Sequence, residues 1–138
     1  MGCHRLKDWY GTASVGFLPA HGVDANLRFA KAENRRFSEG RGIRLDTYLK
    51  DELEADHVGF TILELEPDGE GKEHDETETG QEEIYYVVAG EIEVELTDAA
   101  ETVALAEDQL LRLDPEVTRK IVNRGEERAK VVLVGAPL

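Results

Sequence analysis

From residue 57 onward, hydrophobic and polar residues alternate in short runs separated by turn-forming residues. The segment 91–96, EIEVEL, is the clearest case, because its three apolar residues alternate with three glutamates. A period of two predicts a strand with one face in the core and one in solvent. Similar runs are HVGFTILELEP, EIYYVVAG, ETVALA, DQLLRLDP, TRKIVNRG and AKVVLVGAP. Such runs at a spacing of roughly 8–12 residues are typical of an antiparallel sandwich or barrel, so the chain is predicted to be all-β.

Turn-forming residues mark the predicted ends of these strands. Pro67-Asp68-Gly69 predicts the end of the first long strand, because proline presets φ and glycine accepts a positive φ. Ala89-Gly90-Glu91 predicts a tight turn between two paired strands. Further upstream, we expect an edge strand near residues 43–49.

The first 40 residues show no sustained hydrophobic period. They mix glycine, proline and basic residues, and only the segment 25–37, ANLRFAKAENRRF, has a pattern that could form a short helix. A chain of 138 residues suffices for one ordinary domain. We therefore predict a partly ordered N-terminal arm at 1–40 and one barrel domain at 41–138.

Acidic residues are concentrated beyond residue 50. Residues 1–50 contain nine Lys and Arg against five Asp and Glu, whereas residues 51–138 contain seven against 25. This excess of negative charge repels phosphates and anionic lipids, so neither nucleic acid nor a membrane is an expected partner. The acidic, lysine-poor balance is typical either of a halophile-like, salt-adapted protein or of an ordinary acidic cytosolic one. The single cysteine and the absence of a long apolar run favour a cytoplasmic location.

The segments 67–90 and 107–123 resemble the two sequence motifs of the cupin family. Six residues separate Glu83 from Gly90, as the first motif requires, and His74 stands where its first histidine belongs. In the second motif, Pro115 matches the turn and Asn123 the final asparagine. The resemblance implies an antiparallel double-sheet β-barrel, the cupin-type jelly roll. It also implies a homodimer, because small barrels of this family commonly bury a sheet between subunits.

The metal-binding positions depart from the family pattern. A cupin metal centre normally uses two histidines and a glutamate from the first motif and one histidine from the second. Here Glu76 replaces the second histidine and Arg119 the last. The remaining candidate ligands are His74, Glu76 and Glu83, with Glu78 as an alternative to Glu76. Such an oxygen-rich set would hold one divalent ion, Fe, Mn, Ni or Zn, only weakly, and the permanent cation of Arg119 would repel it.

Three functions remain open at this point. The first is a barrel that binds a small, anionic organic ligand in its mouth, anchored by Arg119 and lined by Tyr85 and Glu83, with weak or no metal. The second is a metal-dependent enzyme of the oxygenase, isomerase or decarboxylase class, with His74, Glu76 and Glu83 as metal ligands. The third is a structural or interaction barrel. The loss of two histidines favours the first, no catalytic residue can be assigned, and whether the protein is an enzyme stays open.

Overall fold

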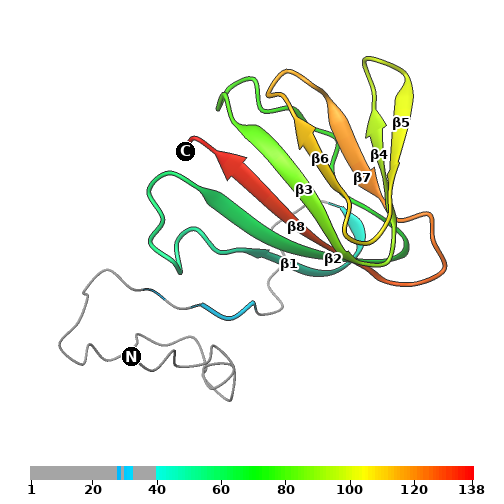
Figure 1. The fold of residues 1–138 in the computed structure, drawn as a ribbon, viewed down its shortest axis with the longest axis horizontal. Helices are drawn as coiled ribbons and strands as arrows, with labels where there is room; N and C mark the ends of the chain where they lie inside the picture. The colour runs from blue at the N-terminus through cyan, green and yellow to red at the C-terminus, as the bar shows by residue number, and fades with distance from the viewer. Residues whose placement is uncertain (1–27, 29, 33–39) are drawn as a thin grey trace, which may run out of the picture.

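The computed structural model describes Arg28, residues 30–32 and residues 40–138, and all regular elements in these ranges are β-strands (Figure 1). There are eight of them. Their bounds are β1 Arg41–Tyr48, β2 Gly59–Glu70, β3 Glu82–Ala89, β4 Ile92–Leu96, β5 Glu101–Leu105, β6 Leu110–Leu113, β7 Arg119–Val122 and β8 Ala129–Ala136. The prediction of an all-β chain is confirmed.

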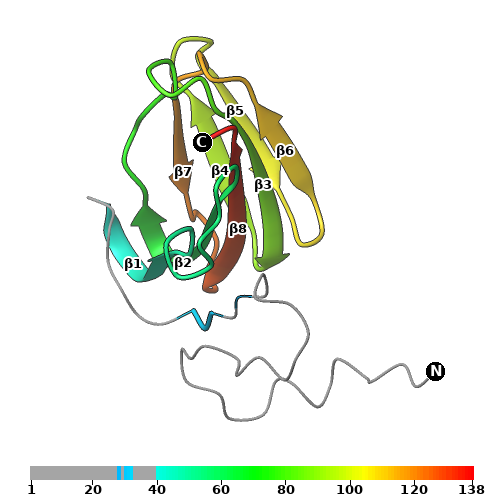
Figure 2. The ribbon, with the colours of Figure 1, turned by 90° about the vertical axis from the view of Figure 1, so that its left-hand side faces the viewer.

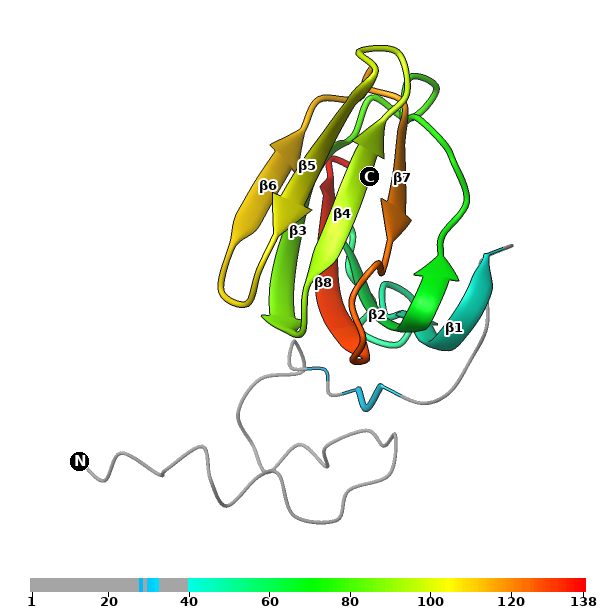
Figure 3. The ribbon, with the colours of Figure 1, turned by 90° about the vertical axis from the view of Figure 1, so that its right-hand side faces the viewer.

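The strands form one antiparallel sheet that curls into a nearly closed barrel. Its order is β5-β4-β7-β2-β8-β3-β6, and β1 pairs with β2. Figures 1 and 2 show β3, β8 and β2 side by side in one layer, and Figure 3 shows β4 and β5 in the layer across from β3 and β8. Since β5 and β6 are the two ends of the order, the barrel has one unpaired seam. This is the double-sheet barrel that the sequence predicted.

Strand β2 links the two layers, and here one prediction was wrong. The turn expected at Pro67-Asp68-Gly69 does not end the strand, which runs to Glu70. Asp68 adopts a left-handed φ of 61°, and the strand bends there instead of stopping. The bent segment stays paired because the Asp68 N–H donates to the Asn123 carbonyl at 2.8 Å, and the Asn123 N–H donates to the Gly69 carbonyl at 2.8 Å.

The predicted turn at Gly90 is present, but the two strands that it joins are not paired with each other as expected: β3 pairs with β6 and β8, and β4 pairs with β5 and β7. Gly90 has a φ of 77°, and a Cβ placed on it would lie 2.7 Å from the Arg128 carbonyl oxygen. Both the backbone angle and the close approach require glycine at this position. The turn lets β3 and β4 enter opposite layers of the barrel.

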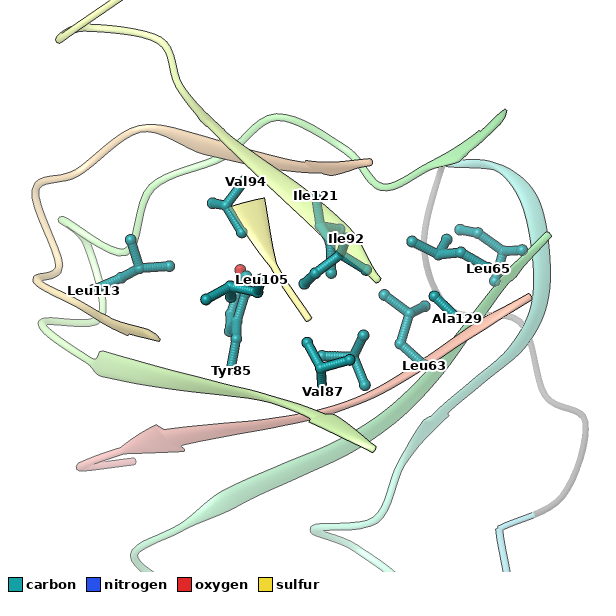
Figure 4. Close-up of a cluster of buried hydrophobic side chains, with 12 residues drawn as sticks. Leu63, Leu65, Tyr85, Val87, Ile92, Val94, Leu105, Leu113, Ile121 and Ala129 are labelled. Atoms are coloured by element: carbon teal, nitrogen blue, oxygen red, sulfur yellow. The ribbon is translucent and has the colours of Figure 1, made fainter. Parts of the chain in front are cut away.

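The core lies between the two layers, as Figure 4 shows. From one layer, Leu63, Tyr85 and Val87 point inward, and from the other Ile92, Val94 and Ile121 face them. The inward residues alternate along β3 and β4, as the sequence pattern predicted for 91–96 and for Tyr85 and Val87. Tyr85 is 1% exposed.

Most of the expected N-terminal arm lies outside the described residues, as does most of the possible helix at 25–37. Within it, Arg28 and Ala30–Ala32 have no regular structure. Arg28 Nη2 forms an ion pair of 2.7 Å with Glu54 Oε2. Among the described residues, no helix is long and apolar enough to cross a membrane.

Candidate functional site

Glu83 lies inside the barrel near the start of β3. Alternation along this strand puts its side chain on the inward face with Tyr85 and Val87, and its side chain is only 14% exposed. The Tyr85 hydroxyl donates a hydrogen bond to Glu83 Oε2 at 3.1 Å. A carboxylate in such a place needs a cationic or hydrogen-bonding partner.

Arg119 supplies that partner from β7, on the opposite layer. Its Nη2 donates to Glu83 Oε2 at 2.5 Å, and its Nη1 donates to the Val117 carbonyl at 2.8 Å. The side chain is 0% exposed, and Nε has no hydrogen-bond partner among the described residues. Arg119 and Glu83, both expected to contact the ligand, therefore lie together, but the guanidinium is enclosed.

His74 and Glu76 reach the same place from the loop between β2 and β3. His74 and Arg119 exchange two backbone hydrogen bonds, of 3.0 and 2.9 Å, which fix the loop against β7. The Glu76 N–H donates to the Pro115 carbonyl at 2.8 Å, and Thr79 Oγ1 donates to Glu76 Oε2 at 2.6 Å. These contacts hold Glu76 toward His74.

Three of the predicted metal ligands come together. His74 Nε2 lies 3.7 Å from Glu76 Oε1 and 3.8 Å from Glu83 Oε2, and one ligand atom from each residue lies within 4.8 Å of the others. Because bonds from an ion to these ligands are about 2.0–2.2 Å long, two ligands of one ion are about 4 Å apart or less. The spacing fits a divalent ion. Glu78, the alternative ligand, is exposed and is not part of this group.

Burial and neighbouring charges shift the pKa of Glu83 in opposite directions. Burial alone would raise the pKa of Glu83, but the His74 ring and the hydrogen bond from Arg119 outweigh burial and lower it below the ordinary value. The Glu83 carboxylate in turn raises the pKa of His74, more than burial lowers it. His74 Nδ1 lies 3.0 Å from the Lys72 carbonyl oxygen, which accepts a hydrogen bond from that nitrogen and leaves Nε2 facing the two glutamates.

A cavity of about 180 Å³ adjoins Glu83, and we call it the site cavity. Its lining combines polar side chains, among them His74, Glu83 and Tyr85, with aliphatic ones. Its lining residues are Asp46, Thr61, Leu63, Gly71, Lys72, His74, Glu83, Tyr85, Ile121 and Leu133. Arg119 is absent from the lining, so its guanidinium does not face this space. The expected role of Arg119 as a direct anchor for an anion does not follow from this geometry.

Asp46 is the acidic residue among the lining residues that sequence reasoning missed. Simple alternation in RGIRLDTY puts Asp46 on one face with Arg44, which is exposed. The register of β1 on β2 shifts between Ile43 and Leu45, however, so that Ile43 pairs with Leu65 and Asp46 with Leu63. A bulge of this kind moves every following side chain to the other face. Nothing in the local sequence signals it.

Solved structures with the same fold come from proteins of different kinds. One is the cupin domain of a transcriptional regulator from Enterobacter cloacae, with 18% identity over 71% of this chain and 99% of that chain and a TM-score of 0.60. Another is the polyketide cyclase RemF from Streptomyces resistomycificus, with 20% identity over 77% and 72% of the chains and a TM-score of 0.64. A third is a cupin protein from Bacteroides fragilis, with 18% identity over 83% and 86% and a TM-score of 0.64. At these identities the likeness concerns the fold alone.

Comparison with curated proteins finds no match. A family model for the cupin domain matches residues 61–135, which contain β3 to β7 and nearly all of β2 and β8, together with the whole His74–Glu83–Arg119 cluster. Sequence motif, strand order and family model therefore agree, and this chain belongs to the cupin domain family.

Proposed function

We propose that the protein binds a small organic molecule in the site cavity and does not depend on a tightly bound metal. The observation that carries this proposal is the cavity itself, whose lining combines polar groups with the aliphatic side chains of Leu63, Ile121 and Leu133. Ligand pockets typically have this mixture. At about 180 Å³ the cavity is smaller than the roughly 300–1,000 Å³ that hold drug-sized ligands, so the ligand is small.

Arg119 acts through Glu83 in this proposal. Its two Nη groups are already bonded to Glu83 and to the Val117 carbonyl, so a ligand meets the Glu83 carboxylate and the Tyr85 hydroxyl first. A fixed ion pair of this kind keeps the carboxylate ionised and oriented. The anionic ligand that the sequence favoured would have to use His74 or Lys72 at the cavity rather than Arg119.

Weak metal binding follows from the same Glu83–Arg119 ion pair. Glu83 Oε2 accepts hydrogen bonds from both Arg119 and Tyr85, and an ion at this carboxylate would lie close to a buried positive charge. Coulomb repulsion at such distances costs several kcal/mol at the effective dielectric of a protein, by order of magnitude. The cluster therefore holds a divalent ion less tightly than a set with a neutral histidine at position 119 would.

Methyl NMR with a small probe tests the binding proposal. We expect isobutanol to shift the methyl resonances of Leu63, Ile121 and Leu133, which surround the site cavity. A Leu133→Phe variant fills the cavity and should abolish the shifts. The matched control is Val134→Phe, on the neighbouring position of β8 that faces the other side of the sheet. Absence of shifts with isobutanol, isobutylamine and isobutyrate alike would contradict the proposal.

A metal-dependent enzyme is the second candidate, and the spacing of His74, Glu76 and Glu83 favours it. These three side chains would hold the ion, which would act as a Lewis acid toward a bound oxygen atom. Elemental analysis of protein purified without chelator or affinity-tag metal separates the two candidates. Near-stoichiometric Fe, Mn, Ni or Zn that is lost in His74→Ala would favour the enzyme. Substoichiometric metal, unchanged in that variant, is the result expected from the first proposal.

A further inference from the structure

Asp46 is a buried carboxylate that has no counter-ion among the residues that the structure describes. It is 5% exposed, and among the described residues no hydrogen bond or ion pair involves its side chain. The other buried polar side chains of the described part all have partners. Arg119 bonds Glu83 and Val117, Asn123 bonds the carbonyls of Leu65 and Glu127, and Thr47 has a contact of its own.

The side chain is buried, but its oxygens keep some accessible surface, because Arg119 Nε is the one fully buried, unbonded side-chain atom among the described residues. A carboxylate in such a place is satisfied by water or by a donor group of a ligand. Asp46 and Leu63 are paired across β1 and β2, and both line the site cavity together with Glu83. The carboxylate therefore faces the cavity rather than packed protein.

The strand is distorted so that Asp46 takes this position. Without the register shift between Ile43 and Leu45, Asp46 would face the side of the sheet on which Glu64 lies. Bulges are frequent beside binding sites, where they redirect one side chain. Unsatisfied or strained groups persist where function requires them.

We propose that Asp46 is the acceptor that selects the ligand of the site cavity, and that this ligand carries a hydroxyl or ammonium donor on a small aliphatic body. The proposal rests on ligand binding in the cavity and names its chemistry. The ligand's donor bonds the Asp46 carboxylate, and its carbon atoms contact Leu63, Ile121 and Leu133. Glu83, which Arg119 already neutralises, also lines the cavity.

Three probes that share one carbon skeleton test the selection. Isobutanol, isobutylamine and isobutyrate differ only in a hydroxyl, an ammonium and a carboxylate group. We expect the alcohol and the amine to shift the cavity methyl resonances at lower concentration than isobutyrate. Asp46→Asn should weaken the binding of isobutylamine by about tenfold or more, since hydrogen bonds to charged groups contribute about 1.5–3 kcal/mol. The comparison of alcohol and amine in the wild type shows which donor Asp46 prefers.

Asp46→Leu adds a readout that separates a binding role from a structural one. Since the carboxylate has no protein partner, this variant should unfold at the same or a higher urea concentration than the wild type, while losing the preference for donors. The control Asp51→Asn removes the same charge at an exposed position and should change neither property. Wild-type preference for isobutyrate, an unchanged preference in Asp46→Asn, or clear destabilisation by Asp46→Leu would overturn the assignment of Asp46. Such results leave cavity binding intact, whereas no methyl shift with any probe would remove the proposed function itself.

Discussion

Glu83 on β3 and Arg119 on β7 join the two layers of the barrel through a hydrogen-bonded ion pair of 2.5 Å inside the protein. The arginine is fully enclosed, and the glutamate is 14% exposed. In the family pattern, the position of Arg119 belongs to a metal-binding histidine. A fixed cation thus stands where a bound cation is usual, and the carboxylate has a positive partner in either case.

Breaking this pair should destabilise the fold strongly. Arg119→Met leaves the Glu83 carboxylate buried without its cation and leaves the Val117 carbonyl without its donor. Loss of one partner of a buried pair typically costs about 3–5 kcal/mol of unfolding free energy, which urea denaturation would measure. The double variant Glu83→Leu/Arg119→Met removes both charges and should recover a large part of the loss.

The control for that experiment is Arg112→Met. Arg112 is 57% exposed and pairs with Glu82 and Asp114 at the surface. Exposed pairs contribute about 0–1 kcal/mol. An Arg119→Met variant that lost no more stability than Arg112→Met would show that the enclosed pair has no structural role.

The pH dependence of stability should reflect His74 and Glu83 in opposite directions. The pKa of His74 is raised by the Glu83 carboxylate, so its stabilising contribution is complete below its unfolded value of about 6.5 and is lost as the pH rises through the folded pKa. The pKa of Glu83 is lowered despite burial, so its contribution is present above about pH 4.3 and is lost as the pH falls through the folded pKa.

The measurement is the difference in unfolding free energy between wild type and His74→Gln at pH 5.5 and pH 8, which should be larger at pH 5.5. NMR titration measures the pKa of His74 and tests whether Glu83 is the cause of this difference. In Glu83→Gln the pKa of His74 should move toward its ordinary value, while Glu82→Gln, whose side chain is on the other face of β3, should leave it in place. If the pKa of His74 were the same in Glu83→Gln and Glu82→Gln, His74 would not be coupled to Glu83.

Much of the fold was predictable because its signals are local. Alternation places Ile92, Val94 and Tyr85 inward, and Gly90 sits where only glycine fits. The extent of β2 was not predictable from Pro67-Asp68-Gly69, since the turn residues bend the strand while Asn123, more than 50 residues away in the sequence, keeps it paired. Local turn chemistry does not tell a bend from an end when the partner strand is distant.

The candidate site likewise has features that the sequence predicts and features that it does not. The motif spacing around Glu83 and Arg119 was sufficient to bring them together, and His74 and Glu76 joined them. The enclosure of Arg119 and the inward turn of Asp46 depend on packing and on a register shift in β1. Both are tertiary properties, and both change the expected ligand chemistry from an anion bound by arginine to a hydrogen-bond donor bound by carboxylate.

Restoring the family histidine should create a stronger metal site. Arg119→His removes the enclosed cation and places an imidazole beside His74, to which position 119 is paired through the backbone. We expect affinity for Zn²⁺ or Ni²⁺ to rise by at least about tenfold, comparable to the effect of residues that support metal ligands. Isothermal titration calorimetry measures it.

Lys120→His is the matched control for this gain, because the neighbouring side chain faces Glu70 and Glu95 on the outer surface. Adding Glu83→Gln to Arg119→His should remove the gained affinity. If Lys120→His gained as much as Arg119→His, the new affinity would belong to a surface histidine and the barrel site would have no part in it.

The expected homodimer has a candidate surface on the outer face of β2, β8 and β3. Phe60, Val134 and Ile84 lie opposite one another across these strands, and Ile84 is 38% exposed. A sheet face with aromatic and aliphatic side chains is stable in water when a second surface covers it, and a two-fold dimer would pack this face against itself.

Sedimentation equilibrium tests the dimer directly. The wild type should have twice the 15.4 kDa mass of the chain, and Ile84→Arg should shift it to monomer, because a charge at the centre of a self-complementary face meets its own copy. Thr102→Arg places the same charge on an exposed position of β5 in the other layer and should leave the mass unchanged. A monomeric wild type at about 100 µM, well above the dissociation constants of stable dimers, would rule out the homodimer. A dimer that Ile84→Arg leaves intact would place the interface on another face.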